Sequence, residues 1–274
     1  MKQIRRKSVL IELLQDCNLS CEYCFYQDKG REKGYMSLEL FKKSINPDVD
    51  NVYLSGGEPF LNPDILEIIR AIKYNGKKCT IFSNGIGLFR FGDVEREEIL
   101  SNIDKIIISF DTFDENYRLR GDNTQNIEKI IKEILRFSPN ILEVKICVNK
   151  YNVEKFEETI LGLSDLGVKT LSVNIVHDIS SNEKKFRVEP EQIIKVYQII
   201  DKYGEMFSSN LIDAQKKFIN KEYNSLFTSC KAGYEFYFVN FKGEKEICPV
   251  PNKNKGISTI NCFSEVCVNL WEVF

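Results

Sequence analysis

Three cysteines stand close together near the N-terminus of this 274-residue chain. They are Cys17, Cys21 and Cys24, and the chain's one histidine, His177, lies far from them in sequence. Three thiolates can ligate three irons of a [4Fe–4S] cubane and leave the fourth iron open. A structural zinc site needs four closed ligands, and zinc or simple packing of the thiols is the alternative. The spacing favours an iron–sulfur cluster with one open iron.

A second group of cysteines near the C-terminus could hold another cluster. Its members are Cys230, Cys248, Cys262 and Cys267. Four thiolates suffice for one [4Fe–4S] cluster, and dispersed structural thiols or a zinc site are the alternatives. The two other cysteines, Cys79 and Cys147, fall within apolar segments, so we expect both in the core.

The segments that must position these residues alternate between expected strands and helices. Strands are expected at 9–14, 52–55, 79–83, 106–110, 142–148 and 170–175, and helices at 38–45, 64–74, 95–100, 127–137, 154–166 and 190–203. Six strand–helix units predict an α/β fold with a parallel sheet, a partial (β/α)6 barrel of the TIM type. A helix at 211–227 and a β-hairpin at 234–248 follow. We therefore expect a barrel at residues 1–205 and a small C-terminal hairpin-and-helix extension at 206–274.

Short motifs of glycine or polar residues follow several of the expected strands. They are Gly56, Gly57 and Glu58 after the second strand, Ser83 and Asn84 after the third, Ser109, Asp111 and Arg120 at or after the end of the fourth, and Asn149 after the fifth. Chemistry in parallel strand–helix barrels collects at the carboxyl ends of the strands, so we expect these residues to share one site. Taken alone, each motif could be an ordinary turn, a helix cap or a surface ion pair.

The pattern Cys-x3-Cys-x-Tyr-Cys at residues 17–24 resembles the signature of the radical S-adenosylmethionine (SAM) superfamily, with Tyr23 at its aromatic position. Gly-Gly-Glu-Pro at residues 56–59 is similar to the motif that binds the SAM amino group in that family. Arg120 comes where relatives carry an arginine that contacts SAM. The resemblance implies a [4Fe–4S] cluster held by the first three cysteines. It also implies SAM contacts from Tyr23 and from the strand-end residues named above.

The same resemblance implies a reaction. In this family the reduced cluster passes an electron to SAM, and the 5′-deoxyadenosyl radical that results abstracts hydrogen from a substrate. The chain is therefore expected to be a radical SAM oxidoreductase or maturase, supplied by an electron donor such as flavodoxin or ferredoxin.

The C-terminal cysteines resemble the auxiliary-cluster extension called SPASM, or its shorter twitch form, which implies a second [4Fe–4S] cluster. Either Cys262 or Cys267 could stay free as a hydrogen-atom donor. His177 is either a substrate contact or a solvent-exposed loop residue.

Composition narrows the range of partners. The 38 Lys and Arg residues nearly balance the 40 Asp and Glu residues, which argues against binding nucleic acid. No apolar run is long enough to span a bilayer, and no secretory signal follows the N-terminus, so we expect a cytoplasmic protein without a membrane partner. The aromatic residues of the expected hairpin either line a substrate groove or form the hairpin core; they are Tyr234, Phe236, Tyr237 and Phe238.

Three functions fit this sequence. The leading hypothesis is a maturase that crosslinks a peptide or epimerises one of its residues. The second is a small-molecule dehydrogenase or oxidase, and the third is a non-catalytic iron–sulfur or zinc-binding protein. Because the cysteine loop begins by residue 17, we expect no peptide-recognition domain ahead of it, which weakens the first hypothesis.

Overall fold

The computed structural model describes residues 7–24, 26, 30–117, 119–120, 127–175, 185–207 and 236–246. Several predictions from the sequence lie outside these described residues. They concern the helix at 211–227, Tyr234, His177 and the C-terminal cysteines Cys230, Cys248, Cys262 and Cys267.

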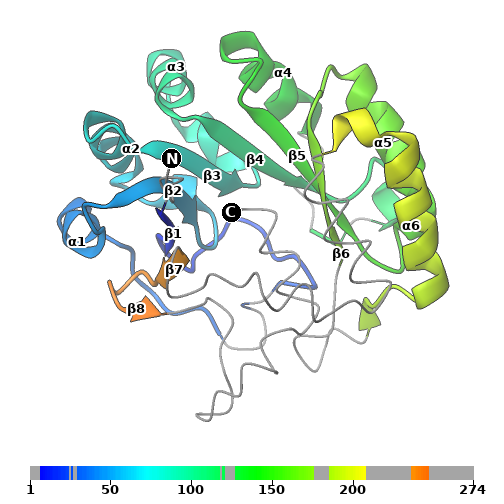
Figure 1. Cartoon of the computed structure of the whole chain (residues 1–274), viewed down its shortest axis with the longest axis horizontal. Coiled ribbons are helices and arrows are strands. Elements are labelled where there is room, and N and C mark those ends of the chain that lie inside the picture. Colours follow the sequence, from blue (N-terminus) through cyan, green and yellow to red (C-terminus); the bar gives the residue numbers. More distant parts are fainter. Residues whose placement is uncertain are drawn as a thin grey trace, which may run out of the picture.

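Strands and helices alternate along the described chain as the sequence predicts (Figure 1). The strands are β1 (Lys7–Glu12), β2 (Val49–Ser55), β3 (Lys78–Ser83), β4 (Lys105–Phe110), β5 (Leu142–Val148) and β6 (Leu171–Ile175); the helices are α1 (Leu38–Ser44), α2 (Ile65–Tyr74), α3 (Asp93–Asn102), α4 (Ile127–Phe137), α5 (Phe156–Asp165) and α6 (Pro190–Lys202). Neighbouring strands from β1 to β6 pair in parallel. The predicted parallel α/β partial barrel is confirmed.

A hairpin extends this sheet beyond β1. Its strands are β7 (Phe236–Val239) and β8 (Lys245–Glu246), which pair antiparallel. β7 also pairs in parallel with β1, with Ser8 opposite Phe236 and Ile11 opposite Val239. The strand order is therefore β6-β5-β4-β3-β2-β1-β7-β8. The predicted hairpin is present, and it is part of the same sheet as the barrel strands.

The helices form because their apolar residues recur on one face. In α4, the buried residues Ile127, Ile130, Ile131 and Ile134 follow the three-and-four spacing of an amphipathic helix. α1 begins where the Ser37 side chain accepts a hydrogen bond from the Leu40 amide at 3.2 Å. None of the helices in the described part of the chain combines the length and the apolar character needed to cross a bilayer.

The strands have two different faces, because successive side chains point to opposite sides of a sheet. One face packs against the helices, which lie on the convex side of the curved sheet in Figure 1, and residues such as Ile11 and Val144 form the main core there. The opposite, inner face carries a smaller apolar cluster, which we call the inner apolar patch. It consists of Leu10, Tyr53, Phe82, Phe236 and Phe238.

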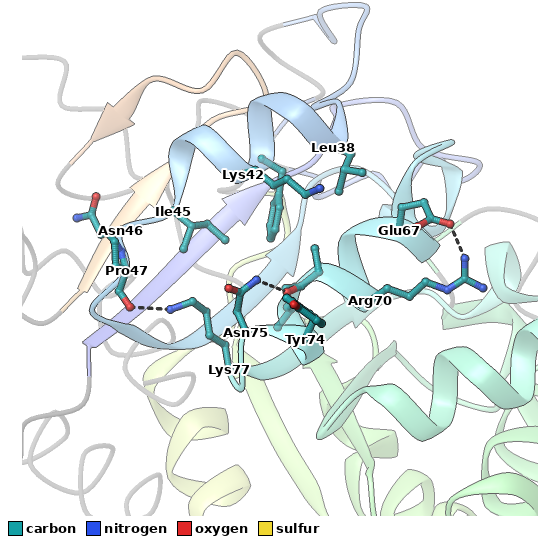
Figure 2. A pocket seen from close by; sticks show the side chains of 13 residues that line it. Leu38, Lys42, Ile45, Asn46, Pro47, Glu67, Arg70, Tyr74, Asn75 and Lys77 are labelled. Atoms are coloured by element: carbon teal, nitrogen blue, oxygen red, sulfur yellow. Dashed lines mark hydrogen bonds and ion pairs between the residues drawn. The ribbon is translucent and has the colours of Figure 1, made fainter.

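A hollow of about 700 Å³ lies on the outer surface between α1 and α2 (Figure 2). Its polar groups are largely paired with one another or with the backbone. Lys77 Nζ donates to the Pro47 carbonyl at 2.9 Å, and Asn75 Nδ2 donates to the Ala71 carbonyl at 2.8 Å. No described cysteine lines this hollow, so it is separate from the site predicted at the strand ends.

Candidate active site

The loop that carries the N-terminal cysteines follows β1 and is tied to its surroundings through its backbone. Arg31 donates from Nη1 to the Cys17 carbonyl at 3.2 Å and from Nη2 to the Leu19 carbonyl at 3.0 Å. The Glu22 amide donates to the Leu119 carbonyl at 2.8 Å. These bonds hold the loop in place through its backbone carbonyl and amide groups.

The three thiols differ in exposure: Cys21 is buried, whereas Cys17 and Cys24 are half-buried. Burial raises the pKa of the Cys17 thiol and raises that of Cys21 to about 12, because a buried thiolate loses its hydration. Iron binds the thiolate form. The positive charge of bound iron would therefore stabilise the deprotonated thiols, which burial in this loop otherwise disfavours.

The number of thiols in the cysteine loop can be compared with what zinc and a cluster need. Among the described residues, no group of three or more His, Cys, Asp and Glu side chains is placed to hold one metal ion. Zinc would need such ligands around a single point. A cubane receives each thiolate on a separate iron, so the three thiols of the cysteine loop fit a [4Fe–4S] cluster with one open iron.

Gly56 and Gly57 bring the loop after β2 directly against the cysteine loop. The Gly57 amide donates to the Leu14 carbonyl at 2.8 Å, and the Glu58 amide donates to the Asp16 carbonyl at 2.9 Å. A Cβ on Gly57 would stand 2.1 Å from the Asp16 oxygen, and one on Gly56 would stand 2.3 Å from the Leu14 oxygen. Both positions therefore need glycine for this backbone contact, which the sequence did not reveal.

The Glu58 side chain is fully buried and joins the loops after β2 and β3. Its Oε1 accepts from Ser83 Oγ at 2.7 Å and from the Phe60 amide at 3.1 Å, and its Oε2 accepts from the Asn84 amide at 2.8 Å. Burial raises the pKa of this carboxyl to about 7, although the three hydrogen bonds act in the opposite direction. Glu58 thus holds the turn after β3 and titrates near neutral pH.

Asn84 continues from this turn to the cysteine loop. Its Nδ2 donates to Asn18 Oδ1 at 2.8 Å and lies 3.7 Å from Cys17 Sγ. Its Oδ1 accepts from the Ile86 amide at 2.9 Å. The residues predicted after the second and third strands are therefore brought together around the first cysteine.

A buried ion pair joins the segment after β4 to the other side of the cysteine loop. Arg120 Nε donates to Asp111 Oδ1 at 2.7 Å, and the Tyr23 hydroxyl donates to the same oxygen. Arg120 Nη2 donates to Cys147 Sγ at 2.9 Å, and Nη1 lies 3.9 Å from Cys21 Sγ. Cys147 is buried in the interior as predicted, and it faces inward beside Arg120 because alternate residues of β5 point to that side. Cys79 is in the main core.

Asn149 has a fully buried amide nitrogen, Nδ2, without a hydrogen-bond partner. Its carbonyl oxygen accepts from the Tyr151 amide at 2.9 Å, and its backbone amide donates to Asn152 Oδ1 at 2.7 Å. A buried donor without an acceptor costs about 1–3 kcal/mol. An acceptor atom of a bound cofactor would recover this cost, so the site fits a polar ligand such as SAM.

Three further residues of the site were not predicted from the sequence. Arg31 and Asn18 lie within or just beyond the cysteine loop, where no pattern distinguishes them from surface residues. Asn152 Nδ2 donates to the carbonyls of Cys147 and Asp111 at 2.8 and 3.2 Å. The Asn-x-x-Asn pair at 149–152 was the signal that could have revealed it.

Curated proteins similar to this chain have names that refer to different substrates. A tungsten-containing aldehyde ferredoxin oxidoreductase cofactor-modifying protein of Pyrococcus furiosus is 28% identical over 61% of this chain and 51% of its own length. A probable GTP 3′,8-cyclase of Methanococcus aeolicus is 25% identical over 88% of this chain and 79% of its own length. The antilisterial bacteriocin subtilosin biosynthesis protein AlbA of Bacillus subtilis is 27% identical over 61% of this chain and 39% of its own length. The chain thus spans about half the length of the first of these relatives.

Among solved structures, Streptococcus suis SuiB bound to its precursor peptide SuiA has a similar fold. The TM-score is 0.71 at 18% identity, over 97% of this chain and 64% of SuiB. The family model described as Radical SAM superfamily matches residues 11–188, which include the cysteine loop and the strand-end motifs from β2 to β5. With more than half of its residues in that match, the chain belongs to the radical SAM superfamily.

Proposed function

We propose that this radical SAM enzyme modifies a peptide, by forming a crosslink or by epimerising a residue. The observation that carries the proposal is the inner apolar patch, in which Leu10, Phe236 and Phe238 are buried and the rings of Tyr53 and Phe82 are partly buried. An apolar side chain of a substrate would contact the partly buried rings of Tyr53 and Phe82, and this contact would remove it from water. The bacteriocin-biosynthesis relative and the fold shared with a peptide-bound enzyme support the same substrate class.

A nucleotide is the second candidate substrate, because a probable GTP 3′,8-cyclase is similar to most of the chain. A triphosphate is normally held by several cationic side chains or a metal. On the described inner face, Lys105 is already paired with Glu143 at 2.7 Å, which leaves two separate cations without an ion pair, Lys145 and, at the start of β3, Lys78. The charge of this face therefore favours a peptide over a triphosphate.

In this proposal Cys17, Cys21 and Cys24 hold the first cluster, which when bound supplies the electron that splits SAM into methionine and a 5′-deoxyadenosyl radical. Asn149 Nδ2 donates to SAM, and Asp111 orients Arg120 toward its carboxylate. The remaining contacts come from the strand-end residues; they are Tyr23, Gly56, Gly57, Glu58, Ser83, Asn84 and Ser109.

We also propose a second [4Fe–4S] cluster held in residues 206–274. Its ligands would be drawn from Cys230, Cys248, Cys262 and Cys267. Either of the last two could instead donate a hydrogen atom to the substrate radical, which would complete an epimerisation. A flavodoxin or a ferredoxin would supply the electrons.

The substrate class is tested with dithionite-reduced, anaerobically reconstituted enzyme and SAM. We expect short peptides encoded near the gene to increase the formation of 5′-deoxyadenosine and to change in mass. GTP serves as the comparison substrate. Stimulation by GTP, with no peptide modified, would contradict the peptide proposal.

The number of clusters is tested by measuring iron and sulfide in the wild type and in a variant with Cys17, Cys21 and Cys24 changed to Ala. We expect about eight irons in the wild type and about four in the variant. A wild type with only about four irons would remove the second cluster from the proposal.

A further inference from the structure

Lys145 occupies the middle of β5, on the inner face of the sheet. The neighbouring residues Val144 and Ile146 belong to the main core on the helix side, so Lys145 points the other way. In the strand pairing it lies beside Ser109 of β4 and Ser172 of β6. A lysine in this position places a cation inside the barrel rather than on its outer surface.

The charge of Lys145 is not neutralised by the described part of the chain. The nearby carboxylate of Glu143 accepts from Lys105 at 2.7 Å and from Ser172 Oγ at 2.6 Å, so both of its oxygens are engaged. Lys145 forms no ion pair with any described acidic residue, and its Nζ lies 5.4 Å from the centre of the Phe82 ring. Lys145 is half-buried beside this ring, and an anionic ligand would pair with its ammonium group.

The inner face is divided by polarity around this lysine. Leu10, Phe236 and Phe238 lie on β1 and β7, and Tyr53 and Phe82 continue the inner apolar patch over β2 and β3. The strands β4, β5 and β6 present mostly polar side chains on this face, among them Ser109, Glu143, Lys145 and Ser172, with the buried Ile107 as an apolar exception. A ligand that fits both halves carries an apolar group and an anionic group.

We infer that Lys145 anchors the substrate by pairing with one of its carboxylates, while an apolar side chain of the same substrate packs on Tyr53 and Phe82, the partly buried rings of the inner apolar patch. This inference rests on the proposed peptide function and narrows it to a peptide with an acidic residue near an apolar one. Ser109, which we assign to SAM, is the neighbour of Lys145 in the sheet. The anchored carboxylate would thus hold the peptide beside the cofactor.

The experiment uses the reconstituted holoenzyme with SAM and two pools of end-blocked peptides. The pools are identical and free of acidic residues, except that one has Asp and the other has Asn next to a fixed Phe. Peptides retained after ultrafiltration are quantified by mass spectrometry. We expect the wild type to retain the Asp pool about tenfold better than the Asn pool, as a charge-assisted hydrogen bond would give.

Variants of Lys145 test whether its positive charge causes the preference for the Asp pool. Lys145→Met should abolish the preference for Asp, and Lys145→Arg should keep it, because only the arginine retains a cation. Lys132→Met, which removes a charge from the exposed face of α4, is the matched control and should behave as the wild type. Iron content and circular dichroism confirm that each variant is folded and loaded.

The outcomes separate the anchor from the peptide function. Equal retention of both pools, or an Asp preference that survives in Lys145→Met, overturns the anchor alone. Weakened binding of SAM in Lys145→Met also overturns it, because the ammonium then belongs to the cofactor. Retention of neither pool overturns both the anchor and the peptide function.

Discussion

At the scale of single residues, protonation of the Glu58 carboxyl makes the free energy of unfolding depend on pH. Its carboxyl has a pKa of about 7 in the folded chain, compared with the ordinary value of 4.5, because it is buried. Between these two values the folded protein keeps a proton that the unfolded chain loses. The free energy of unfolding therefore falls as the pH rises through this window, by roughly 3 kcal/mol.

Glu58→Gln should remove this fall, because glutamine does not titrate. The measurement is urea unfolding of SAM-free protein across the window from pH 4.5 to pH 7. Glu128→Gln, on the exposed face of α4, is the control and should keep the wild-type pH dependence. Identical slopes in Glu58→Gln and the wild type would show that the buried carboxyl does not titrate in this range.

Asn149 offers a second test at this scale, because its side-chain oxygen accepts a hydrogen bond within the protein whereas its Nδ2 has no partner there. Aspartate at this position keeps an oxygen for the Tyr151 amide but replaces the unpartnered Nδ2 with an acceptor. Asn149→Asp should therefore weaken SAM binding about tenfold or more while the fold is retained. The measurement is equilibrium binding of SAM to the reconstituted enzyme, with the exposed Asn75→Asp as the control for added charge. Unchanged affinity would mean that Nδ2 does not contact SAM.

At the scale of elements, the contact between the loop after β2 and the cysteine loop depends on glycine. In Gly57→Ala, the new methyl group would stand 2.1 Å from the Asp16 oxygen and 2.5 Å from the Gln15 oxygen, both of them backbone atoms. The cysteine loop must then move, so we expect the loss of about four irons per chain.

Gly204→Ala is the matched control for this substitution, because nothing lies within 4 Å of the added methyl group. Iron and sulfide analysis after reconstitution is the measurement for both variants. Full iron in Gly57→Ala would show that the cysteine loop can shift without releasing its cluster.

The sequence predicted the elements of the barrel well, because their apolar periodicity is local. α4 and β5 have the predicted bounds of 127–137 and 142–148. The sequence also predicted the motifs that meet at the strand ends. It did not predict that Arg31 would hold the cysteine loop or that Cys147 would contact Arg120. Such contacts join residues far apart in the chain, and no local pattern records them.

At the scale of the whole molecule, β7 joins the C-terminal part of the described chain to its first strand, β1, in one sheet. It pairs with β1, and Phe236 and Phe238 pack against Leu10 across this pairing. The Phe241 ring also lies 3.1 Å from the position of a Cβ on Gly34, and Lys242 forms an ion pair with Glu32. Local patterns predict a hairpin here but not its partner, since more than two hundred residues separate β7 from β1.

This arrangement makes the proposed boundary between residues 205 and 206 testable. A fragment of residues 1–205 would lose β7, which would expose one edge of β1 and part of the inner apolar patch. Exposed strand edges promote association between chains, so we expect this fragment to unfold at lower urea concentration and to aggregate. A fragment of residues 1–246 keeps both hairpin strands and is the control. If the shorter fragment were monomeric with the urea midpoint of the control, the barrel would be stable without β7, and the hairpin would serve the C-terminal extension alone.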